Sequence, residues 1–116
     1  MLMTVTIERL PEATAVVTVS GPMTLGTSLQ IADSQVRAVI ADGVTRLVFD
    51  LTAVDYVDSA GLGMIVFTSG VLGEKNGVLR LCGVAPRVAS LLKLTKMDSL
   101  IPVDAGRAES LAAFAQ

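Results

Sequence analysis

The residues best suited to take part in chemistry are Asp58 and Ser59, which begin the hexapeptide Asp58-Ser59-Ala60-Gly61-Leu62-Gly63. They precede a long apolar run, so we expect them at the N-terminus of a helix, where backbone N–H groups lack partners within the helix. Aspartate and serine are favoured there because their side-chain oxygens accept hydrogen bonds from those N–H groups. A helix cap is therefore the simplest interpretation of this pair.

Ser59 also supports a second interpretation, in which its hydroxyl is a phosphorylation site. A phosphate would add a charge of about −1.5 to −2, and the N–H groups of a helix N-terminus tolerate such a charge. The fold would then survive the modification while the surface offered to a partner changes its charge. The sequence predicts either a structural cap or a phosphorylation switch at this residue.

The helix that positions Ser59 is predicted over residues 59–74, and it ends before Lys75-Asn76-Gly77. Its apolar side chains lie on every side of the helix, which is more than one buried stripe requires. They are Leu62, Met64, Ile65, Val66, Phe67, Val71 and Leu72. We therefore expect part of this helix to be exposed, or to be covered by a second protein.

The remaining elements follow from apolar periodicity. Strands are predicted over 3–9, 14–19, 46–51, 78–82 and 100–103, with the first two forming a hairpin. Helices are predicted over 25–41, over 59–74, from Pro86 onward and in a closing segment after Asp104. Strands that alternate with helices indicate a largely parallel sheet. The expected fold is α/β, with a mixed sheet of about four to five strands, about four helices and a single domain over 1–116.

Particular residues are expected to set the helix boundaries. Thr24 or Thr27 would cap the helix over 25–41, and Leu25 would begin its apolar stripe. Gly43 follows the last turn of that helix, as a C-terminal glycine should. Pro86 fits the first turn of its helix, and Asp104 would cap the closing helix.

The composition excludes several classes of function. The 116 residues include no histidine and one cysteine, so we expect no zinc site and no Ser-His or Cys-His catalysis. A net charge of −2 and 3% aromatic residues argue against direct nucleic-acid binding. The uncharged apolar run over 59–73 has fifteen residues and four glycines, whereas a membrane helix needs roughly 20 apolar residues. We expect a cytoplasmic protein that is not an enzyme, inserts in no membrane and carries no cofactor.

Four other features have simpler interpretations than chemistry. Gly61-Leu62-Gly63 is a poor dinucleotide loop, because Val66 stands where the third glycine belongs. Cys82 lies on a predicted buried strand, where an inert thiol is expected. Asp50 ends a strand and Asp55 lies in a loop, and nothing in the sequence places these two acids together. The basic residues of the segment after Pro86 are expected to form a solvated face; they are Arg87, Lys93 and Lys96.

The segment VDYVDSAGLGMIV resembles the STAS family, which is shared by anti-sigma factor antagonists and the tails of sulphate transporters. The resemblance covers nearly the whole chain, through the preceding LVFDLTAVDYV, the later LRLCGVAPRVASLLKLTKM and the closing IPVD. The length fits a stand-alone antagonist. The resemblance implies partner switching: the unmodified antagonist binds an anti-sigma factor with a serine-kinase fold, phosphorylation releases it, and a phosphatase resets it.

Carried over to this chain, the resemblance makes Ser59 the phosphate acceptor, with Asp58 flanking and capping the helix. Together with Ala60, Gly61, Leu62 and Gly63 these residues form the implied partner-binding surface. Many family members have a second hydroxyl in the motif, where this chain has Ala60, so Ser59 is the acceptor that remains. Many members also carry an acidic residue after the second strand, whereas this chain has Gly21-Pro22-Met23-Thr24 there.

Two alternatives stay open at this point. In one, the chain is a constitutive scaffold or assembly subunit of a lipid-transport or stress-signalling complex, and Ser59 is simply a cap. In the other, it is a nucleotide-binding or hydrolytic enzyme, a class for which the sequence lacks histidine, metal ligands and a phosphate loop. The apolar helix could also support a homodimer.

Overall fold

The computed structural model describes residues 2–115 and has one five-stranded sheet in the order β1-β2-β3-β4-β5. β1 pairs with β2 in antiparallel fashion, and the remaining strand pairs are parallel. This confirms the predicted mixed α/β sheet. In chain order, the elements are β1 (Thr4–Leu10), β2 (Thr14–Ser20), α1 (Thr27–Ala41), β3 (Arg46–Ala53), α2 (Ser59–Glu74), β4 (Val78–Cys82), α3 (Pro86–Leu94), the 3₁₀ helix η1 (Met97–Ser99), β5 (Val103–Asp104) and α4 (Arg107–Phe114).

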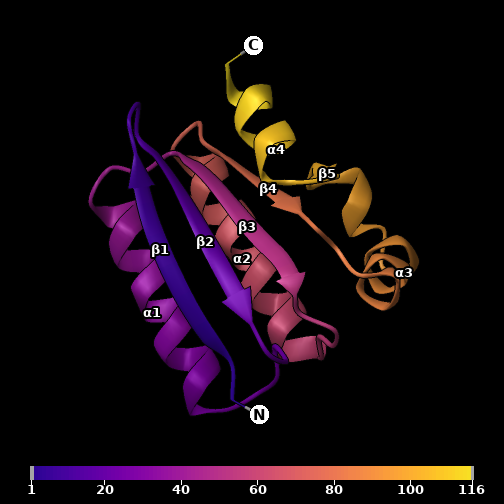
Figure 1. Cartoon of the computed structure of the whole chain (residues 1–116). Helices are drawn as coiled ribbons and strands as arrows, with labels where there is room; N and C mark the ends of the chain where they lie inside the picture. Colours follow the sequence, from indigo (N-terminus) through magenta and orange to yellow (C-terminus); the bar gives the residue numbers. More distant parts are fainter. Residues whose placement is uncertain (1, 116) are drawn as a thin grey trace.

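The sheet is covered on both faces, but unequally. α1 and α2 lie side by side against one face, and they share a large apolar core with α3 (Figure 1). The other face carries a smaller cluster, in which Val16, Val48 and Cys82 of the strands meet Leu111 and Phe114 of α4. The central strand β3 contributes to both clusters, which explains its run of apolar residues on both faces.

The loops that follow β2 and β3 lie together because these two strands are parallel and adjacent. The Gly21 N–H donates to the Ala53 carbonyl at 3.0 Å, and the Met23 N–H donates to the Tyr56 carbonyl at 3.0 Å. Met23 and Val57 also form an isolated parallel bridge. The segment after Ser20 is thus fixed along the segment that leads into α2, and both reach the same edge of the sheet.

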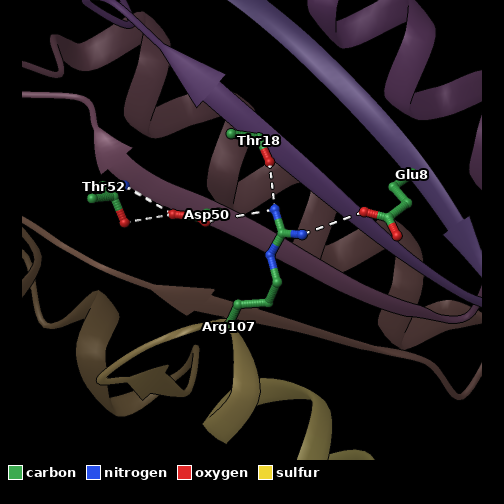
Figure 2. A network of polar contacts seen from close by, with 5 residues as sticks. All are labelled: Glu8, Thr18, Asp50, Thr52 and Arg107. Carbon is green, nitrogen blue, oxygen red and sulfur yellow. Dashed lines mark hydrogen bonds and ion pairs between the residues drawn. The ribbon is translucent and has the colours of Figure 1, made fainter.

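Arg107, in the first turn of α4, ties that helix to three strands (Figure 2). Its guanidinium donates to Thr18 Oγ1 at 2.9 Å and to Glu8 Oε1 at 3.3 Å, and it lies 3.8 Å from Asp50 Oδ2. Asp50 also accepts hydrogen bonds from the hydroxyl and the N–H of Thr52, at 2.7 and 3.1 Å. These polar contacts hold the start of α4 against the sheet, in addition to the smaller apolar cluster.

A second polar contact joins α4 to the edge of the sheet. Arg80 on β4 donates two hydrogen bonds to the Asp104 carboxylate, at 2.8 and 3.0 Å. The buried Ser110 hydroxyl of α4 donates to the same carboxylate at 2.7 Å. The hydrogen bond from Arg80 holds the pKa of Asp104 below its usual value, and the one from Ser110 adds to this effect.

Most predicted boundaries agree with the structure, and the exceptions have identifiable causes. α2 and β4 have the predicted bounds, Pro86 begins α3, and Gly43 follows α1 with a φ of +111°. The predicted caps of α1 were wrong, because Gly26 is its N-cap residue and no side chain caps it. Asp104 does not cap α4, which begins after Gly106, because its carboxylate is occupied by Arg80 and Ser110.

The last strand also differs from its prediction over 100–103. Residues 97–99 form the 3₁₀ helix, Leu100 is exposed, and Ile101 is buried in the large core outside any strand. β5 is reduced to Val103–Asp104, which pair with Leu81 and Cys82. The apolar residues of this segment predict a strand, but Ile101 packs into the core as a loop residue and does not pair with another strand.

Candidate functional site

Asp58 is the N-cap residue of α2, as the sequence predicts. Its backbone is extended, with φ −91° and ψ −175°, and its Oδ1 accepts the Gly61 N–H at 2.9 Å. Its carbonyl accepts the Leu62 N–H at 2.9 Å and begins the helical hydrogen-bond series. The carboxylate thus satisfies one of the N–H groups that a helix start leaves without a partner.

The same carboxylate makes a second contact, 33 residues away along the chain. Its Oδ2 accepts the Leu25 N–H at 2.9 Å, and the Asp58 N–H donates to the Met23 carbonyl at 3.1 Å. Hydrogen bonds from the N–H groups of Leu25 and Gly61 hold the pKa of Asp58 below its usual value. Asp58 is therefore an anion that joins the start of α2 to the loop before α1.

Gly61 is required by the close approach of that loop. A Cβ at this position would lie 2.2 Å from the Met23 carbonyl oxygen, a distance at which the backbone has to move. Gly61 is buried, so any contribution that it makes to a partner surface is through the placement of α2. Gly63 differs, because it is exposed and a Cβ there would meet no neighbouring atom within 4 Å.

Ser59 is the first residue of α2 and is exposed. Ala60 and Leu62, which follow it in the motif, are half-buried and pack against the large core. Because Asp58 already accepts the Gly61 N–H, Ser59 is not needed as the cap. Its hydroxyl is therefore open to solvent at the positive end of a helix, a place that suits an added phosphate.

A groove between α1 and α2 extends away from Ser59. It has a volume of about 210 Å³ and includes Ala60, Gly63 and Phe67 of α2 in its lining. From α1, the Arg37 guanidinium lies 4.1 Å from the centre of the Phe67 ring and is paired with Asp33 at 2.8 Å. Val66 and Phe67 are both exposed. This confirms that α2 carries more apolar surface than its core contacts use.

The other residues considered from the sequence have structural roles. Cys82 is fully buried, and burial raises the pKa of its thiol to about 11, which agrees with an inert core residue. Asp50 is engaged by Thr52 and Arg107, while Asp55 is an exposed loop residue. The predicted solvated face on and after α3 is confirmed, since Arg87, Lys93 and Lys96 are all exposed.

The described residues show neither a metal-binding cluster nor a membrane-spanning helix. Within residues 2–115, no three His, Cys, Asp or Glu side chains are grouped so that they could hold a metal ion. None of the helices described for this chain has the length and apolar character needed to cross a membrane.

The site thus consists of an exposed serine beside a capping aspartate, at the start of an apolar helix that packs on a mixed five-stranded sheet. The STAS domain family model matches residues 4–110, and this chain belongs to that family. A candidate anti-sigma factor antagonist of Bordetella bronchiseptica, BtrV, is 32% identical over 82 residues, which is 71% of each chain.

Solved structures with a similar fold include an anti-sigma factor antagonist. The crystal structure of an anti-sigma factor antagonist from Mycobacterium paratuberculosis has a TM-score of 0.86 and 28% sequence identity, and the match covers 98% of this chain and 95% of that one. The Bacillus cell-fate determinant SpoIIAA, solved in its phosphorylated form, has a TM-score of 0.78 at 13% identity, with 97% and 100% of the two chains covered. At that identity, SpoIIAA shows likeness of fold alone.

Leu25 is the residue of this region whose position was predicted wrongly from the sequence. Its apolar character and its spacing from Leu29 predict a buried position on α1. In the structure α1 begins at Thr27, and Leu25 lies in the preceding loop with 76% of its surface exposed. The run Gly21-Pro22 that ends β2, together with Gly26, was the available sign that this segment is a loop.

Proposed function

We propose that this chain is an anti-sigma factor antagonist that acts as a partner switch at Ser59. In its unmodified state it binds an anti-sigma factor with a serine-kinase fold, in the cytoplasm, and frees the sigma factor. The kinase transfers a phosphate to the Ser59 hydroxyl and the antagonist is released. A phosphatase restores the binding form, and this chain itself performs no catalytic step.

The observation that carries the proposal is the exposed Ser59 hydroxyl, free of the capping role that Asp58 fills. Names of related proteins support the antagonist role, and SpoIIAA is a protein of this fold known in a phosphorylated form. There is no lysine or arginine from Leu47 to Glu74. A phosphate on Ser59 would therefore lie beside Asp58 without a neighbouring cation on α2, and it would have to be desolvated inside any contact made there.

The switch is tested with Ser59→Ala and Ser59→Asp used as baits in the native lysate, with mass spectrometry of captured proteins and of Ser59 itself. We expect the Ala bait to capture an anti-sigma factor with a kinase fold, the Asp bait to lose it, and phosphate on Ser59 in cells. Ser90→Asp, at an exposed position on α3, adds the same charge elsewhere and should still bind. Equal capture by all baits, with Ser59 never modified, would rule out the switch.

A second candidate function is a constitutive subunit of a larger assembly. It is favoured by Val66 and Phe67, which are exposed on α2 about two turns beyond Ser59. A partner covering these residues could stay bound whatever the state of Ser59. In that case Phe67→Ser would abolish capture, whereas Ser59→Asp would leave it unchanged.

A further inference from the structure

Leu25 is an exposed apolar side chain on a backbone that is held in place. Because 76% of its surface is exposed, its side chain adds little to the packing of the apolar core. Its N–H is bound to Asp58 Oδ2 at 2.9 Å, and Met23, two residues before it, bridges Val57. A side chain presented from an ordered backbone loses little conformational freedom when a partner buries it, which favours binding.

Leu25 is part of a larger apolar surface. It lines a hollow of about 470 Å³ together with Leu2 and Ile31, which are 77% and 54% exposed. Three large aliphatic side chains gathered around one recess are more than scattered surface leucines. The hydrogen bond from the Leu25 N–H to Asp58 Oδ2 holds the backbone of Leu25 next to the start of α2, where Ser59 follows Asp58.

The charges around this surface restrict what can cover it. The chain has no lysine or arginine in residues 10–36 or 47–74, which include the loops after β2 and β3 and the starts of α1 and α2. Asp55 and Asp58 are the acids of the loop that leads into α2. A second copy docked face to face through a twofold axis would bring like charges together, which is unfavourable. A partner with basic side chains around an apolar contact is complementary.

We propose that Leu25 is the apolar anchor through which this chain docks to its partner, and that Asp58 is the positioning residue that holds it beside Ser59. The partner presents an apolar recess rimmed by lysine or arginine. This inference rests on the proposed function, because it names the surface on which the anti-sigma factor sits. It adds a contact outside the Asp58–Gly63 motif, in the loop where many relatives carry an acid.

The test is site-specific photocrosslinking in the native host, with benzoylphenylalanine placed in the full chain at position 25, 56 or 94. Tyr56 is exposed close to Ser59 in sequence, and Leu94 is a matched control, 82% exposed on α3. α1 and α3 lie toward opposite edges of the sheet (Figure 1). The affinities of Leu25→Ser and Leu94→Ser for the captured anti-sigma factor are then measured by calorimetry.

We expect positions 25 and 56 to capture the same kinase-fold anti-sigma factor and position 94 to capture none. Leu25→Ser should weaken binding about tenfold or more, as for a central apolar contact, while Leu94→Ser leaves it unchanged. Capture at 56 with normal affinity of Leu25→Ser overturns the anchor but leaves the proposed function standing. Capture of a second copy at position 25 overturns it in favour of a dimer. Absence of any anti-sigma factor at both 25 and 56 overturns both proposals.

Discussion

Gly61 and Gly63 stand two residues apart in the same helix, yet the structure gives them opposite requirements. A Cβ at Gly61 would lie 2.2 Å from the Met23 carbonyl oxygen, whereas one at Gly63 would meet open space. We predict that Gly61→Ala destabilises the fold by about 1–2 kcal/mol, because overpacking exceeds the gain in helix propensity. Gly63→Ala should stabilise it by about 0.5–1 kcal/mol.

Urea unfolding of the two variants, followed by circular dichroism, measures this difference. The two substitutions add the same methyl group to the same helix, so each is the control of the other. Equal effects on the free energy of unfolding would mean that the loop carrying Met23 does not press on α2 as described.

Asp58 leads to a prediction about pH. Hydrogen bonds from Leu25 and Gly61 lower its pKa in the folded chain below the ordinary value of 3.8. Its ionised form therefore stabilises the fold above pH 3.8, and that contribution is lost as the pH falls through the lower folded-state pKa. Asn is also a good cap but does not ionise. We predict that Asp58→Asn loses less stability than the parent chain when thermal melts at pH 6 and pH 3 are compared. A parallel loss in both chains would contradict the assignment.

At the scale of elements, the attachment of α4 depends on one carboxylate. Asp104 is mostly buried and accepts two hydrogen bonds from Arg80 and one from Ser110. We predict that Asp104→Asn destabilises the fold by about 2 kcal/mol, since charge-assisted hydrogen bonds are lost and the Arg80 guanidinium is left poorly paired. Because the pKa of Asp104 is lowered, this contribution should be present at neutral pH and lost in acid.

Chemical unfolding of Asp104→Asn, with Glu12→Gln as the control, isolates the effect of burial. Glu12 pairs with Arg46 at 3.2 Å, but its side chain is 79% exposed, and such surface pairs contribute about 0.5 kcal/mol or less. Similar losses for the two variants would show that the Asp104 contacts are no stronger than a solvated ion pair.

The elements predicted best from the sequence are those whose limits are set by nearby residues. α2 begins at the residue after its cap and ends before Lys75-Asn76-Gly77, so its start and stop are local. The closing segment was misjudged because Asp104 is engaged by Arg80, 24 residues earlier in the chain. A capping aspartate and an ion-paired aspartate look alike in a sequence, and the difference depends on which strands become neighbours.

The candidate site shows the same division between local and distant contacts. The sequence is sufficient to place Asp58 and Ser59 at the start of α2. It is not sufficient to place Leu25, because the contact that holds that loop joins residues 33 positions apart. The parallel pairing of β2 with β3 brings the two loops together, and this pairing is a property of the whole sheet.

At the scale of the whole molecule, charge is distributed unevenly. All nine basic residues lie outside residues 10–36 and 47–74, whereas Asp55 and Asp58 lie on the loop beside Ser59. The loops after β2 and β3 together therefore carry these two acids and no basic residue. A partner with complementary basic side chains would be attracted before contact, which raises the association rate in a manner that salt screens.

This distribution predicts how binding responds to ionic strength. For the unmodified chain and its captured anti-sigma factor, we expect the association rate constant to fall several-fold between about 0.05 and 0.5 M salt, as the screening length shortens. Asp55→Asn should reduce this salt dependence, because Asp55 is an exposed acid of the loop that leads into α2. Asp98→Asn, exposed on the 3₁₀ helix η1, removes the same charge elsewhere and should leave it unchanged. Stopped-flow association measures all three, and an identical salt slope for Asp55→Asn and the parent chain would exclude this loop from the approach of the partner.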